Sequence, residues 1–434
     1  MFPPGTLPAF VLVTSLFALW GFANDITNPM VAAFKNVLLL SHFQSSLVQA
    51  AFYGGYCFMA IPAALFIRRF SYKGGILTGL ALYSVGCFLF LPAGSAMDFG
   101  FFLAAYFVMT CGLAFLETTA NPYILSLGPE ETAARRLNFA QAFNPMGSLL
   151  GMFVAKDFIL ARLHPADEET RRVMAGTEPN AFAALVESDL SVIVLPYVLL
   201  GGVVLAVFIG FLLFRLPETR LSDGPRPPLL SSLSRLFQTP RWLGGVVAQA
   251  FYVGVQIMLW TFVIQYAINE LGMTKTTAQG WNIAAMVLFV SSRFVCTWLL
   301  KFFNPGALLA VLALGGIGCL GTLIFVGGWP GLYALVAASG CMSLMFPTIY
   351  GIALRGLGED AKLGSAGLIC AIGGGALMPP LQALLMDGKG VDLAGILISA
   401  TRFSFVLPLI CFVVIAAYGW ATFAVDRRQL PHQG

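Results

Sequence analysis

Two carboxylates stand within stretches that contain almost no other charge. Asp25 lies in an apolar run over residues 8–36, and Glu117 lies in another over residues 99–127. A charged carboxylate inside a membrane helix costs about 2.5–3.5 kcal/mol if it faces lipid, so we expect both side chains to face a cavity or each other. A carboxyl group withdrawn from water favours its protonated form and releases the proton when water enters. The two acids are therefore typical of proton coupling, with a structural carboxylate bound to neighbouring helices as the alternative.

Amides and a proline accompany each acid. Asn24 and Asn28 lie within one helical turn of the first acid, and Pro29 then frees a backbone carbonyl and interrupts the helix. Asn121 follows the second acid by one turn, directly before Pro122. An interrupted helix with free backbone oxygens can also bind Na⁺, so this pattern leaves the coupling ion open between H⁺ and Na⁺.

Two other apolar runs carry polar stripes at helical spacing. Residues 133–161 place on one face Asn138, Gln141, Asn144 and Ser148. Residues 241–270 do the same with Gln249, Tyr252, Gln256 and Trp260. Amides exchange hydrogen bonds with hydroxyl groups and aromatic faces pack against the C–H side of a sugar ring, so the stripes favour a sugar or polyol site. Helix packing, at about 0.6 kcal/mol for each amide, is the alternative. Tyr350 is a weaker candidate of the same kind.

Few basic residues lie close to these stripes. Arg293 is the only one that lies well inside a predicted helix, about two turns from its end, and we expect it to extend to or pair at the cytoplasmic end rather than bind substrate. Arg68, Arg69 and Lys73 occupy the short connection after the second apolar run, and we expect them to support helix contacts on the cytoplasmic face. Anchoring by the positive-inside rule is the alternative.

The elements that must position these residues are membrane helices. Of the 434 residues, 58% are hydrophobic and 10% are charged, against about 25% in an average soluble domain, which excludes a water-soluble globule. One crossing needs roughly 20 apolar residues. Runs of that order span residues 8–36, 42–69, 74–96, 99–127, 133–161, 190–215, 241–270, 277–300, 305–327, 330–355, 361–387 and 400–425. The sequence therefore predicts an all-α membrane protein with twelve transmembrane helices.

A polar, proline-rich segment divides these runs six and six. We expect an N-terminal half over residues 1–215, with an extramembrane loop at about 162–189, a cytoplasmic linker over 216–240 and a C-terminal half over 241–434. A weak internal repeat at an offset of about 230 residues relates the halves; two six-helix halves in parallel repeat around a central cavity form the major facilitator fold.

Composition disfavours other function classes. The net charge is only +4 and no dense basic stripe is present, so nucleic acid is not an expected partner. The eight cysteines lie in apolar runs without paired spacing, and we see no nucleophile or metal cluster, so neither an enzyme nor a cofactor is expected. Loops on the side of the termini hold more lysine and arginine, so we expect both termini to lie in the cytoplasm.

At these residues the chain resembles the L-fucose/proton symporter family of the major facilitator superfamily. The stretches that carry the resemblance include Phe17–Gly21, Leu116–Thr118, Ala120–Pro122, Leu127–Glu130, Arg136–Asn138 and Phe346–Thr348. The resemblance implies that acids in the first and fourth helices line the cavity, and that Glu117, Gln141 and Asn144 match family positions. The family's first-helix acid falls on Asn28, whereas this chain places Asp25 one turn earlier, which moves the charge by about 5 Å.

We therefore expect a secondary active transporter that imports a monosaccharide, L-fucose or a similar hexose, by proton symport through alternating access. Asp25 and Glu117 are the expected proton-coupling groups. The expected sugar-binding residues are Asn24, Asn28, Glu117, Asn121, Gln141, Asn144, Gln256, Trp260 and Tyr350. The alternatives are a Na⁺-coupled glucose/galactose-type transporter and a passive sugar facilitator. The expected partners are the sugar and the lipid bilayer, and the expected oligomeric state is a monomer.

Overall fold

The structure, a computed structural model, describes residues 6–27, 29–40, 42–166, 168–217, 228–375, 377–393 and 396–429. The chain divides into two compact units. The N-terminal unit comprises Phe2–Tyr123 and Phe143–Thr219, and the C-terminal unit comprises Ile124–Ala142 and Arg220–Gly434. The C-terminal unit therefore includes a segment that precedes part of the N-terminal unit in the sequence.

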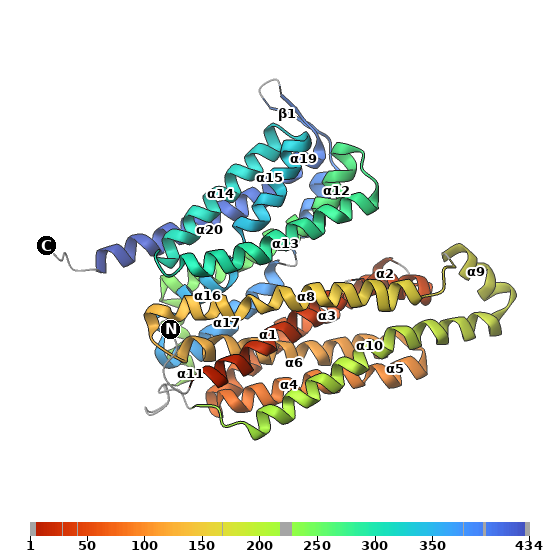
Figure 1. Cartoon of the computed structure of the whole chain (residues 1–434), viewed down its shortest axis with the longest axis horizontal. Helices are drawn as coiled ribbons and strands as arrows, with labels where there is room; N and C mark the ends of the chain where they lie inside the picture. Colours follow the sequence, from red (N-terminus) through yellow and green to blue (C-terminus); the bar gives the residue numbers. More distant parts are fainter. Residues whose placement is uncertain are drawn as a thin grey trace. The chain divides into compact units, whose positions relative to one another are not determined.

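The N-terminal unit is built from long helices with short connections (Figure 1). Its elements are α1 (Leu7–Thr27), α2 (Met30–Val37), α3 (His42–Arg69), α4 (Tyr72–Phe88), α5 (Phe90–Ala96), α6 (Phe99–Ser126) up to Tyr123, α8 (Phe143–Val154), the π-helical turn η2 (Ala155–Ile159), the 3-10 turn η3 (Leu160–Arg162), α9 (Glu168–Thr177) and α10 (Pro179–Leu213).

The C-terminal unit contains the end of α6 and all later elements apart from α8 to α10. These are η1 (Glu130–Thr132), α7 (Ala133–Gln141), α11 (Leu229–Phe237), α12 (Pro240–Leu271), α13 (Lys275–Leu299), α14 (Pro305–Phe325), α15 (Gly328–Cys341), α16 (Met345–Leu354), η4 (Gly358–Asp360), α17 (Ala361–Gly375), α18 (Met378–Met386), β1 (Val391–Leu393), β2 (Ile396–Ile398), α19 (Ala400–Ser404) and α20 (Val406–Gln429). The two strands form an antiparallel hairpin with Val391 opposite Ile398.

The helices match the predicted apolar runs closely. Within the described residues, eleven helical segments are long and apolar enough to cross a membrane. Consecutive helices α7 and α8, broken at Ala142, occupy the remaining predicted run over residues 133–161. The first run is interrupted where the proline predicted it, because α1 ends at Thr27 and α2 begins at Met30. Asn28 itself lies outside the described residues.

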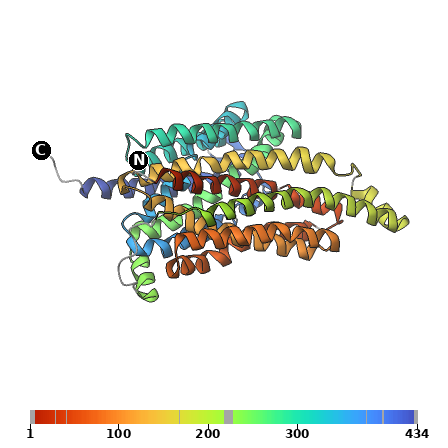
Figure 2. The same ribbon diagram turned by 60° about the horizontal axis from the view of Figure 1, so that its bottom comes forward.

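Glycines allow α1 and α8 to pack at very short distance in the N-terminal unit, and the two helices run side by side in Figures 1 and 2. A Cβ atom added to Gly21 would lie 1.9 Å from the Asn144 backbone oxygen, and one added to Gly147 would lie 1.9 Å from the Ala18 oxygen. Any larger residue would force the helices apart, which is why small residues mark close helix contacts in membranes. This contact fixes Asn144 against α1.

The region expected to be an extramembrane loop at about 162–189 is mostly helical. It contains α9 and the first residues of α10, which begins at Pro179. Arg171 and Asp189 form an ion pair of 2.5 Å whose side chains are only 1% and 3% exposed. Lys35 of α2 also pairs with Glu168 of α9 at 3.0 Å. These ion pairs tie α9 to α2 and α10 of the same unit.

The predicted linker over residues 216–240 contains the amphipathic helix α11, while residues 218–227 lie outside the described ranges. Arg235 of α11 forms a bidentate pair with Asp360, with N–O distances of 2.7 and 2.9 Å. Because the two N–H groups of a guanidinium match the two carboxylate oxygens, the pair fixes the orientation of α11 against η4.

Candidate functional site

Glu117 lies in the interior of α6 without a hydrogen-bond partner among the described residues. The residue is 1% exposed, and neither carboxylate oxygen has a hydrogen-bond partner among the described residues. Buried polar groups in proteins are nearly always hydrogen-bonded, and an orphaned one calls for an explanation such as a functional role or an unseen water or ligand. The burial of Glu117 places its carboxylate inside the N-terminal unit.

Two tyrosines of α3 each interact with one acid of the N-terminal unit. Tyr53 interacts electrostatically with Asp25, and Tyr56, one turn further along α3, interacts with Glu117. The indole nitrogen of Trp20 donates a hydrogen bond to the Tyr56 hydroxyl. Asp25 is half-buried near the end of α1. Tyr53 and Tyr56 are spaced by three residues on α3, and the site prediction included neither of them.

The amides of the N-terminal unit differ in what they contact. Asn24 and Asn144 are half-buried, so part of each side chain is accessible. Asn121 is fully buried, and its side-chain nitrogen donates to the Glu117 backbone oxygen at 3.0 Å. That bond holds the Asn121 side chain along α6, one turn after Glu117.

The predicted stripe of residues 133–161 is divided between the two units. Asn138 and Gln141 lie on α7 of the C-terminal unit, whereas Asn144 and Ser148 lie on α8 of the N-terminal unit. Asn138 donates to the Thr348 hydroxyl on α16 at 3.0 Å, and it also donates to the Ala134 oxygen. Gln141 is 4% exposed. The stripe is therefore interrupted at the helix break, which helical spacing alone did not predict.

In the C-terminal unit, three contacts fix the position of Trp260. Its indole nitrogen donates to Ser339 at 3.1 Å, its ring meets Phe289 edge to face at 5.0 Å, and its backbone oxygen accepts a bond from Asn282. Gln256, one turn earlier on α12, is half-buried. A fixed aromatic ring next to a partly accessible amide is a pair suited to a sugar ring and its hydroxyl groups.

Arg293 is enclosed by the C-terminal unit rather than extended to the end of α13. It is 4% exposed, and it donates hydrogen bonds to the backbone oxygens of Ser343 and, at 3.0 Å, Gln141. Its guanidinium carbon lies 4.6 Å from the centre of the Phe289 ring. Arg293 thus joins α13 to α7. Tyr350 of α16 is fully buried and stacks on Phe346 with ring centres 6.3 Å apart.

The basic connection between α3 and α4 caps another helix of the same unit. The Lys73 ammonium donates to the Leu212 and Phe214 backbone oxygens at 3.0 and 2.9 Å, at the C-terminal end of α10. Cations at helix C-termini satisfy terminal carbonyls and interact favourably with the helix dipole. Arg69 is exposed, and Arg68 is half-buried.

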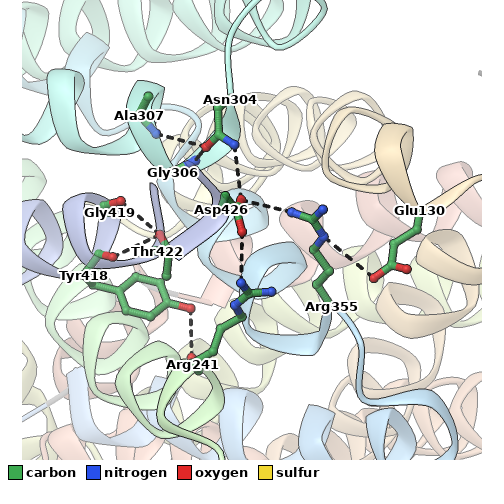
Figure 3. A network of polar contacts seen from close by, with 10 residues as sticks. All are labelled: Glu130, Arg241, Asn304, Gly306, Ala307, Arg355, Tyr418, Gly419, Thr422 and Asp426. Atoms are coloured by element: carbon green, nitrogen blue, oxygen red, sulfur yellow. Dashed lines mark hydrogen bonds and ion pairs between the residues drawn. The ribbon is translucent and has the colours of Figure 1, made fainter. Parts of the chain in front are cut away.

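A network of charges joins helix ends in the C-terminal unit (Figure 3). Asp426 pairs with Arg241 at 2.9 Å and with Arg355 at 3.0 Å, and it accepts a hydrogen bond from Asn304. Arg355 also lies 3.8 Å from Glu130, in the connection between α6 and α7. One carboxylate therefore joins the ends of α12, α16 and α20. No three His, Cys, Asp or Glu residues in the described parts of the chain gather as a metal site.

Comparisons with known proteins agree with this architecture. The model of the Major Facilitator Superfamily matches residues 13–366. An L-fucose-proton symporter of Haemophilus influenzae is 53% identical over 425 residues, which cover 96% of each chain. A glucose/galactose transporter of Brucella abortus is 31% identical over 420 residues, covering 95% of this chain and 93% of the relative.

A solved structure is similar over nearly the whole chain. A crystal structure of the Escherichia coli fucose:proton symporter FucP matches with a TM-score of 0.86 and 34% identity, covering 96% of this chain and 99% of that chain. The expected fold, an all-α membrane protein with twelve transmembrane helices in the major facilitator arrangement, is confirmed. The chain belongs to the L-fucose-proton symporter family of the Major Facilitator Superfamily, a family of multi-pass membrane transporters.

Proposed function

We propose that this protein imports L-fucose, or a hexose of similar stereochemistry, together with protons by alternating access. The single observation that carries the proposal is the buried carboxylate of Glu117, whose oxygens have no hydrogen-bond partner in the described part of the chain. Such a group can accept a proton or a sugar hydroxyl without first breaking an internal bond. The relatives named as L-fucose-proton symporters support the same activity.

In this proposal Glu117 binds the sugar and exchanges a proton, and Asp25 is the second titratable group. The residues proposed to shape the sugar site are Asn24, Asn28, Asn121, Gln141, Asn144, Gln256, Trp260 and Tyr350. The half-buried amides contact hydroxyl groups, and Trp260 packs against the C–H face of the ring. The basic residues Arg68, Arg69, Lys73 and Arg293 support conformations rather than binding sugar.

The proposed coupling ion is H⁺, because Glu117 offers one carboxylate that has no hydrogen-bond partner among the described residues. Na⁺ needs several oxygen ligands, and the candidate for it is Asp25 with the backbone oxygens around Pro29. Sodium coupling and passive facilitation therefore remain the competing functions. The relative named as a glucose/galactose transporter is the reason to test those sugars as well.

The proposal places the protein in the bacterial inner membrane as a monomer with both termini in the cytoplasm. The greater number of lysine and arginine residues in loops on the side of the termini supports this orientation. The functional halves are proposed as residues 1–215 and 241–434, joined by a linker over 216–240.

Uptake by the purified chain in proteoliposomes tests the proposal. Labelled L-fucose, D-glucose, D-galactose and N-acetylglucosamine are supplied under an inward proton gradient, an inward sodium gradient or no gradient. We expect L-fucose to accumulate above its external concentration only with the proton gradient, and a protonophore to abolish the accumulation. Protein-free liposomes provide the control for leakage.

The other outcomes decide among the alternatives. Accumulation that needs Na⁺ and ignores the proton gradient would favour sodium symport. Equilibration without accumulation under any gradient would favour a facilitator. Proton-driven uptake of glucose or galactose in preference to L-fucose would overturn the proposed substrate and leave the proposed proton coupling intact.

A further inference from the structure

Gln249 of the C-terminal unit is another buried polar residue whose side chain has no hydrogen-bond partner among the described residues. The residue is 0% exposed on α12, and within the described ranges neither its side-chain oxygen nor its nitrogen forms a hydrogen bond. A buried amide that has lost its hydrogen bonds to water and gained none in the protein destabilises the fold. An unsatisfied buried group in a native structure calls for an explanation, and a functional role is one of them.

The contacts between α12 and α16 show what Gln249 faces. A Cβ atom on Gly245 would lie 2.4 Å from the Ala353 Cβ, and the rings of Tyr252 and Phe346 meet with centres 6.0 Å apart. The two helices are therefore antiparallel here, and both contacts fit one register. In that register Gln249 lies level with residues 349 and 350 of α16.

Helical spacing places the tyrosine of α16 opposite this amide. Phe346, Tyr350 and Ala353 are separated by four and three residues, so they share the face of α16 that packs on α12. Gly245, Gln249 and Tyr252 share the opposing face of α12 by the same spacing. Gln249 and Tyr350 therefore lie at the same level on the facing sides of two packed helices.

We propose that Gln249 is a sugar-hydroxyl contact of the inward-facing state, used as the sugar leaves toward the cytoplasm. Gln249 lies nine residues from the start of α12, about 14 Å along the helix, whereas Trp260 lies about 16 Å further on. With the termini in the cytoplasm, the amide lies on the cytoplasmic side of the proposed sugar site. This inference rests on the proposed function, and it adds a residue that the sugar site of the previous section does not contain.

The Gln249→Met variant tests the proposal because methionine keeps the length of the side chain and removes both polar groups. We expect the Met variant to melt at or above the temperature of the original protein, because it removes an unsatisfied buried amide. In proteoliposomes sorted by orientation, we expect its KM for L-fucose presented to the cytoplasmic face to rise at least tenfold. The KM at the opposite face should change less than threefold.

Gln382→Met is the matched control in the same unit. Gln382 is also 0% exposed, and its side-chain nitrogen donates to Ser404 at 3.4 Å, while its side-chain oxygen has no hydrogen-bond partner among the described residues. We expect this variant to keep the original KM on both faces. A Gln249→Met protein with unchanged KM on the cytoplasmic face would overturn the proposal, as would a lower melting temperature with unchanged transport.

Two further measurements keep the outcome decisive. If Gln249→Met yields no folded protein, Gln249→Asn keeps the amide and shortens it by one methylene; we expect its cytoplasmic KM to rise at least threefold, and an unchanged value would overturn the proposal. If the unmodified protein transports no hexose in the same vesicles, the proposed function fails, a result distinct from a failure of the Gln249 assignment.

Discussion

At the scale of single residues, the structure contrasts two kinds of buried charge. Arg136 is 0% exposed, yet its guanidinium donates to backbone oxygens at the end of α6, those of Ile124, Leu125, Gly128 and Pro129. Glu117 is equally enclosed but has no such bonds among the described residues. The arginine is a helix cap that stabilises one conformation, whereas the carboxylate retains its full capacity for a proton or a ligand.

Replacing Glu117 by glutamine should separate proton coupling from sugar exchange. The amide cannot take up and release a proton, so we expect proton-driven accumulation of L-fucose to fall to the equilibrium level. Exchange of labelled for unlabelled sugar between two filled sides should persist, because that reaction needs no net proton movement. The measurement is accumulation and counterflow in proteoliposomes.

Glu187→Gln provides the matched control, because Glu187 is an exposed acid of the same unit. We expect that variant to accumulate sugar as the original protein does. Full accumulation by Glu117→Gln would remove Glu117 from the coupling mechanism, and loss of both reactions would show that sugar exchange also depends on the carboxylate.

At the scale of elements, apolar runs and prolines predicted most of the helices and the break near Pro29. The pattern could not predict the fully buried Arg136, because the sequence shows only a pair of arginines after an acidic turn. It did not predict α9 either, since the partner of Arg171 lies 18 residues away on another helix. Contacts between residues far apart in the sequence leave no periodic pattern in it. For the same reason the sequence did not predict that Tyr56 interacts with Glu117.

The buried pair in the extramembrane excursion should control the stability of α9. Asp189→Asn keeps an acceptor for the His164 backbone N–H, which donates to Asp189 at 2.9 Å, but it leaves Arg171 buried without a counter-charge. Breaking such a pair costs about 3–5 kcal/mol. We expect amide hydrogen exchange across α9 to accelerate by at least a hundredfold.

The control is Asp157→Asn, which removes the acid of an exposed pair with Lys156 at 4.0 Å. Exposed pairs contribute about 0–1 kcal/mol, so exchange in α9 should change less than fivefold. Equal protection of α9 in the two variants would contradict a stabilising role for the Arg171–Asp189 pair.

The tie between α2 and α9 should weaken in acid. Hydrogen bonds from Lys35 and then Arg172 hold the pKa of Glu168 below its ordinary value of 4.5. A depressed pKa means that the stabilisation is present above the ordinary value and is lost as the pH falls through the lower value in the folded protein. We expect exchange in α9, corrected for intrinsic rates, to rise below about pH 4.5.

Glu168→Gln should remove this acid-dependent step, whereas Glu169→Gln, at the exposed neighbouring position, should retain it. An acid step that survives in Glu168→Gln would assign the transition to another carboxylate.

At the scale of the whole molecule, the segment Ile124–Ala142 follows the N-terminal unit in the sequence but belongs to the C-terminal unit in the structure. It continues directly from α6, yet it packs with the C-terminal unit through Asn138, the Gln141 backbone oxygen and Glu130. A carrier that alternates between two states must make and break contacts of limited strength, because a very strong contact would trap one state. The Glu130–Arg355 pair lies within the C-terminal unit, and at 3.8 Å with both side chains about half-exposed it is a weak contact.

The charge network of Figure 3 should therefore contain one strong contact, made by Asp426, and one weak contact, made by Glu130. Asp426 is 17% exposed and neutralises both Arg241 and Arg355, so Asp426→Asn should lower the melting temperature of the protein. Glu130→Gln should leave the melting temperature within about 1 °C, since exposed pairs contribute at most about 1 kcal/mol, and should change the transport rate by no more than about fivefold. Because salt screens exposed charges, that rate difference should shrink at high ionic strength, whereas the Asp426→Asn defect should persist. Melting in detergent and uptake in proteoliposomes at two salt concentrations check both outcomes; equal destabilisation by the two substitutions would contradict the division of roles.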